Sequence, residues 1–119
     1  MKVESIVVYQ EAAVPCFCMR KDQIARLRQA FPAARVTWCR SERACLRALP
    51  QAQIAVTWAF RQAWFERAPR LRAILSSAAG RDLSPLAPPP GVTVRYGTFH
   101  GPLMAETVLG MMLAFERGI

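Results

Sequence analysis

The feature that most constrains the fold is a regular alternation between short apolar segments and amphipathic ones. The apolar segments are rich in β-branched and aromatic residues, which is typical of buried parallel strands, and they occupy residues 5–9, 35–39, 53–58, 71–77 and 91–96. Apolar residues at helical spacing predict a helix at residues 21–31, and capping and proline signals predict helices at 41–49 and 61–69. This order predicts βαβ units and a parallel sheet covered by helices on both faces.

Cap and turn residues support these boundaries. Ser41 is a good N-cap, and Pro32 and Pro50 follow the ends of two predicted helices. Short connections and right-handed crossovers then favour a flavodoxin-like, doubly wound α/β sheet of about five strands. A long final helix follows, with Pro102 in its first turn. We therefore expect one flavodoxin-like unit over residues 1–100 and a separate helix over residues 101–119.

The final helix is apolar on nearly every side. Its apolar residues point in almost every direction around the axis, and they are Val108, Leu109, Met111, Met112, Leu113 and Phe115. Because a large apolar surface left in water marks an interface, we expect a homo-oligomer formed through this helix, for example by its exchange between copies.

Charge and length exclude some classes of partner. The formal net charge of +8 favours polyanions, but the arginines are spread along the chain and do not form one run with interleaved aromatics. We read them as solvated helix faces and expect no nucleic-acid partner. No apolar run is long enough to span a bilayer, and the first residues lack a signal-peptide pattern, so we expect a cytoplasmic protein without a membrane partner.

The four cysteines do not have the spacing of a zinc site. Cys16 and Cys18 are separated by one residue, and Cys39 and Cys45 by five. Without a secretion signal a disulfide framework is not expected either. We predict four reduced structural thiols and no metal, with zinc as the minor alternative.

Ligands of open α/β sheets bind beyond the carboxyl ends of the strands. Residues 76–82 lie at the end of the fourth predicted strand and are therefore a candidate binding loop. The small side chains of Ala78 and Ala79 leave backbone amides uncovered, and Gly80 can adopt backbone angles that other residues disfavour. Successive exposed amides form a nest that suits a carboxylate. The alternative is an ordinary turn in which small residues serve packing.

Two further strand ends offer candidates. Trp58 and Phe60 either wall a pocket or belong to the core, and His100, the one histidine, is either a structural hydrogen-bonding residue or a catalyst. The chain has no Gly-x-Gly-x-x-Gly, no phosphate-binding P-loop motif and no Gly-x-Ser-x-Gly. Nothing in it combines a nucleophile, a base and an orienting group, so we predict no catalytic residue.

The second half of the chain resembles a known family. A helix ends in Ala-Pro-x-Leu-Arg at residues 68–72, and a strand leads into Ser-Ser-Ala-Ala-Gly-Arg-Asp at 76–82. A Gly-Val-x-Val strand follows at 91–94, and then a helix with Ala105, Glu106 and a closing Arg117. In order and spacing these segments resemble the N-terminal region of the NAD(P)-dependent D-2-hydroxyacid dehydrogenases. Ala78 replaces a usual glycine and Arg81 a usual apolar residue, and Tyr96 stands where asparagine is common.

The resemblance implies a substrate-binding domain over residues 1–100 and an interdomain crossing helix over 101–119, marked by Ala105, Glu106 and Arg117. It implies that the backbone at Ala79 and Gly80 binds the carboxylate of a small 2-hydroxy or 2-keto acid. We add Ala78, in the same loop, and Trp58, after the third predicted strand, as candidate substrate-binding residues. The family's NAD or NADP site and its catalytic arginine, glutamate and histidine lie in later sequence. We therefore expect an oxidoreductase domain that holds no cofactor and is inactive as this segment alone.

Two alternatives stay open. The first is a small non-catalytic module that binds carboxylates or another protein. The second, which we favour less, is a basic nucleic-acid-binding domain.

Overall fold

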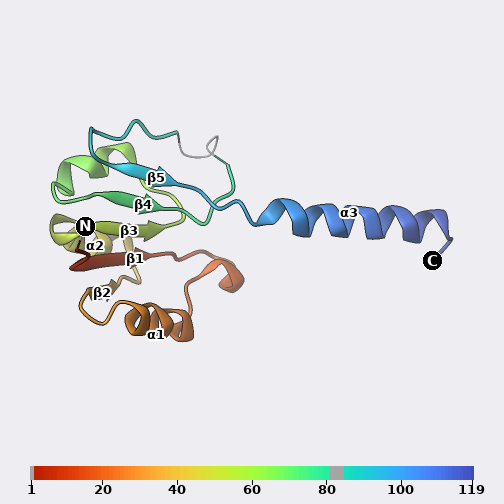
Figure 1. The fold of residues 1–119 in the computed structure, drawn as a ribbon, viewed down its shortest axis with the longest axis horizontal. Helices are drawn as coiled ribbons and strands as arrows, with labels where there is room; N and C mark the ends of the chain where they lie inside the picture. Colours follow the sequence, from red (N-terminus) through yellow and green to blue (C-terminus); the bar gives the residue numbers. More distant parts are fainter. Residues whose placement is uncertain (1, 81–84) are drawn as a thin grey trace.

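The computed structural model of the chain describes residues 2–80 and 85–119. Five strands are present: β1 (Ser5–Tyr9), β2 (Arg35–Trp38), β3 (Ile54–Thr57), β4 (Ala73–Leu75) and β5 (Thr93–Arg95) (Figure 1). The α-helices are α1 (Lys21–Ala30), α2 (Glu42–Ala48) and α3 (His100–Glu116). Three short 3₁₀ helices complete the elements: η1 (Pro15–Phe17), η2 (Leu49–Gln51) and η3 (Gln62–Arg67).

The strands form one parallel sheet in the order β2-β1-β3-β4-β5. This is the flavodoxin-like order of a doubly wound α/β fold, so the predicted fold class is confirmed. Every neighbouring pair is parallel, with Ile6 opposite Val36 and Ile54, and Ile74 opposite Ala55 and Val94. All five carboxyl ends therefore lie at one edge of the sheet.

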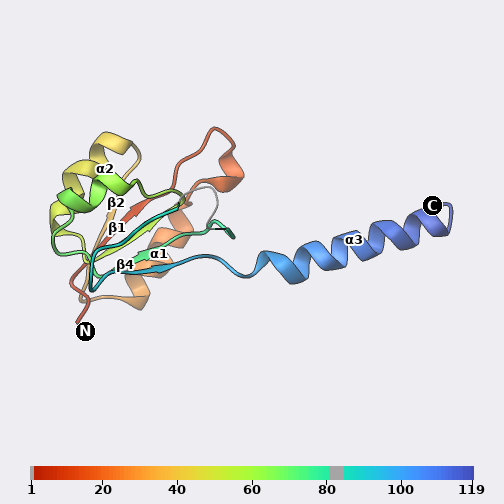
Figure 2. The same ribbon diagram turned by 90° about the horizontal axis from the view of Figure 1, so that it is seen from above.

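Two hydrophobic clusters lie on opposite faces of the sheet. The larger one joins Val7, Ala55 and Ile74 of the sheet to Leu49 and Trp64, which come from the segments near α2 and η3. The smaller one joins Ile6 and Val8 to Ile24 of α1 and Val36 of β2. Figure 2 shows α2 and α1 on opposite sides of the strands. Right-handed crossovers explain why α1 and α2 cover opposite faces. The connection from β1 to β2 runs toward one edge of the sheet and the later connections run toward the other, so their helices lie on opposite sides.

The expectation of helices over both whole faces is wrong for one half of the α1 face. Ile54 and Val56 of β3 are only partly buried, and Leu75 of β4 is 41% exposed. The physical reason is the direction of the connections: α2, η3 and the described residues Leu86 and Val92 before β5 all pack on the α2 side, which leaves α1 alone on its own side. The one remaining helix, α3, does not turn back onto the sheet (Figures 1 and 2).

Most predicted boundaries agree with the structure to within one or two residues, but three features differ. The predicted helix at 61–69 is the 3₁₀ helix η3, β4 and β5 have only 3 residues each, and the short helices η1 and η2 were not expected. Only Trp64 of η3 is buried, so one side chain holds this segment against the core. An α-helix would instead bury a row of apolar side chains along one face. The expected helix at 41–49 begins where predicted, because the Ser41 hydroxyl accepts a hydrogen bond from the amide of Ala44 at 3.1 Å.

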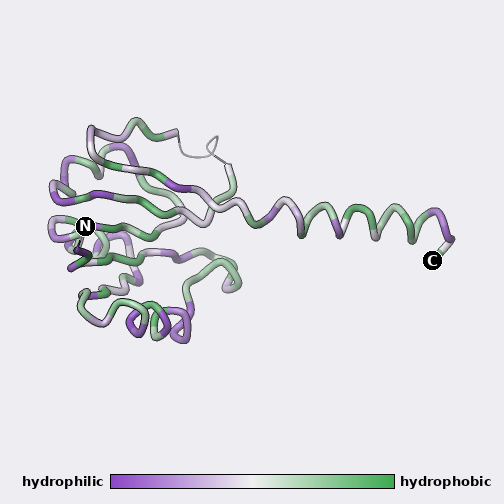
Figure 3. The backbone as a smooth tube through the Cα atoms, viewed as in Figure 1, coloured by the Kyte–Doolittle hydropathy of each residue, from purple (hydrophilic) through white to green (hydrophobic). Residues whose placement is uncertain are grey.

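The α3 helix extends away from the sheet along the direction of β5 (Figure 1). None of its residues is buried, and Met111, Leu113 and Phe115 are 68%, 65% and 86% exposed. Hydrophobic colouring recurs in every part of this projecting helix, interrupted by paler and hydrophilic positions (Figure 3). The radius of gyration is 17.2 Å, whereas a compact chain of this length has about 13.5 Å. In the part of the chain that the structure describes, no helix combines the length and apolarity needed to cross a membrane.

Candidate functional site

The carboxyl ends of β1, β3 and β4 are tied together by side-chain hydrogen bonds. The Ser76 hydroxyl donates to the backbone carbonyl of Trp58 at 2.8 Å, and the Ser77 hydroxyl lies 3.1 Å from Oε1 of Gln10. Because these bonds join three neighbouring strands, they fix the start of the loop after β4. The Ser76–Ser77 pair and Gln10 were not predicted as site residues, and only the adjacent serines were visible as a polar signal in the sequence.

The predicted carboxylate-binding residues lie in this loop but differ in accessibility. Ala78 is buried, its amide donates to the Ser76 hydroxyl at 3.1 Å, and its carbonyl accepts from the amide of Gly97 at 2.9 Å. Ala79 and Gly80 are exposed, and among the described residues no acceptor contacts their amides. Among the described residues, two of the three predicted amides therefore have no hydrogen-bond acceptor, while the third holds the loop in shape. Arg81 and Asp82, also noted in the sequence, lie outside the described residues.

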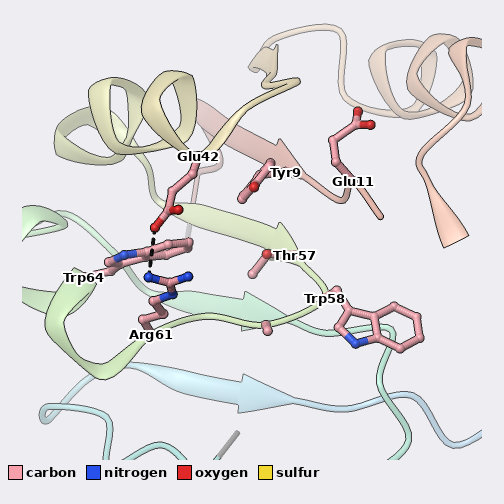
Figure 4. Close-up of a pocket in the computed structure, with 8 residues that line it drawn as sticks. Tyr9, Glu11, Glu42, Thr57, Trp58, Arg61 and Trp64 are labelled. Carbon is pink, nitrogen blue, oxygen red and sulfur yellow. Dashed lines mark ion pairs between the residues drawn. The ribbon is translucent and has the colours of Figure 1, made fainter. Parts of the chain in front are cut away.

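A pocket of about 180 Å³ lies at the same edge of the sheet (Figure 4), and residues 76–80 are not among those that line it. Trp58 forms one end of it, is 36% exposed, and meets Phe17 edge-on with 5.4 Å between ring centroids. Phe60 is 3% exposed and packs against Trp64 in the core. The two aromatic candidates thus divide: Trp58 lines a pocket and Phe60 does not. The full lining is Tyr9, Glu11, Glu42, Thr57, Trp58, Ala59, Arg61 and Trp64.

Both carboxylates of the pocket are paired with arginines. Glu42 lies 3.1 Å from Arg61, the pair that Figure 4 marks, and Glu11 lies 2.5 Å from Arg40. Burial and then the nearby Glu42 carboxylate raise the pKa of Tyr9, so its hydroxyl stays protonated at neutral pH. The pocket therefore offers neutral donors and aromatic walls without a net charge. These pairings join residues 19 to 29 positions apart, and no local sequence pattern announces them.

The remaining candidates do not line the pocket at the carboxyl edge. His100 begins α3 and stacks against Phe99, with 4.0 Å between ring centroids. All four cysteines are free thiols, Cys39 and Cys45 buried and Cys16 exposed. Across residues 2–80 and 85–119, no group of three or more histidine, cysteine or acidic side chains is placed to hold a metal. Ala105, Glu106 and Arg117 are exposed on or just after α3, far along the chain from the loop.

A dinucleotide site is not formed by the described residues. A Rossmann site needs a glycine-rich turn from the first strand into a helix, whose amides hold the pyrophosphate. Here β1 leads instead into the short η1, and only after it, at Lys21, does α1 begin. None of residues 10–20 is a glycine. The NAD or NADP that the family resemblance implies therefore does not fit these residues.

Comparisons of the chain with protein-family models, with curated proteins and with solved structures gave no match.

Proposed function

We propose that the chain is the substrate-binding domain of a D-2-hydroxyacid dehydrogenase and that residues 76–80 bind the carboxylate of a small 2-hydroxy or 2-keto acid. The observation that supports it is the loop after β4. Ala79 and Gly80 are exposed and follow β4 at the carboxyl edge of a flavodoxin-like sheet, where ligands of open α/β sheets bind, and Ser76 of the same loop donates to the carbonyl of Trp58. The sequence resemblance assigns the same loop to the same ligand group.

The chemistry of the loop suits a carboxylate. Hydrogen bonds from neutral amides to an anionic oxygen are roughly twice as strong as those between neutral groups. The loop is already shaped by the bonds of Ser76 and Ala78, so little ordering accompanies binding. In this proposal the chain binds and orients the acid, while hydride transfer belongs to a dinucleotide-binding domain that these residues do not form.

Thermal unfolding in the presence of small acids tests the binding. At ten times its Kd, a ligand of the native state adds about 1.4 kcal/mol of stability, which raises Tm by several degrees. We expect this rise with pyruvate, glyoxylate and hydroxypyruvate, and none with pyruvamide, which has the same shape without the charge. A rise with pyruvamide equal to that with pyruvate would contradict carboxylate recognition.

A backbone substitution locates the site. Ala79→Pro removes one of the two free amides, and losing one hydrogen bond to a charged group, about 1.5–3 kcal/mol, weakens pyruvate binding by roughly 10–100-fold. Ala13→Pro changes another exposed loop alanine and serves as the matched control, with binding unchanged. If the Ala79→Pro variant bound pyruvate as tightly as the wild type, the carboxylate site would lie elsewhere.

A second candidate function is protein interaction through α3. The large exposed apolar side chains of this helix, which are more than half exposed, favour it, since such surfaces are usually covered by a partner. It does not compete with carboxylate binding, because the two features occupy different parts of the chain.

A further inference from the structure

Among the described residues, no helix lies over one half of a sheet face, where only Ile54 and Val56 pack against the edge of the α1-side cluster. The strand registers place six side chains of the α1 side in two rows across β3, β4 and β5, because alternate residues of a strand point to the same face. All six are exposed or only partly buried, whereas Ala55 and Ile74, which face the other way, are 3% and 1% exposed. We name this surface the bare face; its rows are Ile54–Ala73–Thr93 and Val56–Leu75–Arg95.

A face of this kind needs a helix. Parallel sheets are normally covered on both sides, and their central strands are apolar for that reason. The two rows are about 7 Å apart along the strands, and β3 lies about 10 Å from β5, so one helix of about 10 Å diameter covers the area. In a doubly wound sheet of this order, the helix after the last strand is the element that belongs on the α1 side. Here that helix is α3.

The chain does not place its own α3 there. The connection from β5 to α3 is residues 96–99, and Gly97 is held within it. Its amide donates to the carbonyl of Ala78 at 2.9 Å, and a Cβ at this position would lie 3.0 Å from the carbonyl oxygen of Ser77. Only Thr98 and Phe99 remain to reverse the chain direction, which is the lower limit for such loops. A helix from another copy needs no reversal.

We propose that α3 of a second copy of this chain lies on the bare face, and that the exchange is reciprocal. If two copies meet with the carboxyl edges of their sheets toward each other, each α3 runs antiparallel to the strands of the other copy. That is the direction of an ordinary covering helix in a βα unit. The two contacts are identical, so the assembly is closed and two-fold symmetric.

The exposed area is large enough for this dimer. The chain exposes 8607 Å², whereas a compact monomer of 13.3 kDa exposes about 6,500 Å². An excess of roughly 2,000 Å² in each copy matches the area that stable dimers bury. The pocket near the start of α3, lined by Leu103, Met104, Thr107 and Val108, is almost wholly apolar, as a helix packed on a sheet requires.

The charges of α3 and of the bare face are complementary, which also favours α3 of a second copy as the covering helix. The only formally charged side chains of α3 are Glu106 and Glu116, in a chain with a net charge of +8. The bare face carries one charge, Arg95, which is exposed and has no ion-pair partner among the described residues. Glu106 lies in the first half of α3, the half that starts at the carboxyl edge next to Arg95. We assign Glu106 of one copy to Arg95 of the other.

Sedimentation equilibrium between 1 and 100 μM tests the exchange. The wild-type chain is expected to have twice the 13.3 kDa of one copy. Leu75→Arg should weaken dimerisation at least tenfold, while Phe31→Arg, at a position 42% exposed against 41% for Leu75, should leave it unchanged. A wild-type monomer at 100 μM overturns the proposal, and so does a dimer that Leu75→Arg does not weaken, because that result means pairing between α3 helices.

A charge exchange keeps the test decisive if Leu75→Arg fails to fold by circular dichroism. Arg95→Glu and Glu106→Arg should each weaken the dimer, and the double variant should recover most of the loss. A double variant no stronger than either single variant overturns the assigned pair and with it the direction of the helix. The inference does not rest on the proposed function, and pyruvate binding is a separate measurement on the same variants.

Discussion

At the scale of single residues, one serine organises the candidate site. The Ser76 hydroxyl donates to the carbonyl of Trp58 and accepts from the amide of Ala78, so it joins β3 to the loop after β4. The small residues that follow were visible in the sequence. The pairing of Ser76 with Trp58 was not, because it depends on which strands are neighbours.

Ser76→Ala should therefore lower both stability and ligand affinity. Two hydrogen bonds of about 1 kcal/mol each are lost, so the free energy of unfolding in urea should fall by about 1–2 kcal/mol. Ser77→Ala, which removes a single contact with Gln10, is the matched control and should cost about half as much. A Ser76→Ala variant as stable as the wild type would show that the loop is held by other contacts.

The cysteines should separate into two reactivity classes. Burial raises the pKa of Cys45 to about 12, and burial likewise raises the pKa of Cys39. At pH 8 only about one Cys45 in ten thousand is a thiolate, and the thiolate is the reactive form. Iodoacetamide followed by mass spectrometry should label the exposed Cys16 first, with Cys45 labelling about tenfold faster for each pH unit between 7 and 9. Equal rates at Cys16 and Cys45 in the folded chain would contradict the burial.

At the scale of elements, local sequence signals predicted most of what formed. β1 has the bounds expected from its apolar run, and α1 and α2 end within one residue of their prolines or predicted limits. The helix prediction failed in the segment that is held in place by a single buried side chain. Residues 61–69 contain apolar side chains at helical spacing, yet only Trp64 is buried, and the segment forms a 3₁₀ helix. Two other features could not be predicted from the sequence, namely the ion pairs at the pocket and the bare face. Both depend on the order of the strands in the sheet, which no single segment determines.

The cap of α2 gives a direct test of such a local signal. Ser41→Ala removes the side-chain acceptor of the Ala44 amide and should lower the free energy of unfolding by about 1 kcal/mol. Ser41→Asp keeps an acceptor and should restore stability to within a few tenths of a kcal/mol. Equal losses in both variants by urea unfolding would mean that the cap does not define the start of the helix.

At the scale of the whole molecule, the sheet and α3 behave as two separate parts. No residue of α3 is buried, so removal of residues 100–119 should leave the sheet folded. In calorimetry the truncated chain should have a Tm that does not depend on concentration. The full chain should have a Tm that rises between 10 and 100 μM, because dimer formation stabilises the native state by mass action. A full-length Tm independent of concentration would contradict self-association.

The central claim is that the loop after β4 binds a carboxylate through its backbone amides. The most direct measurement is a titration of the ¹⁵N-labelled chain with pyruvate, followed by the amide resonances. The largest shift changes are predicted at Ala79 and Gly80, with smaller ones at Trp58 and none with pyruvamide. Shift changes centred elsewhere, or absent at pyruvate concentrations of tens of millimolar, would contradict the assignment of this loop.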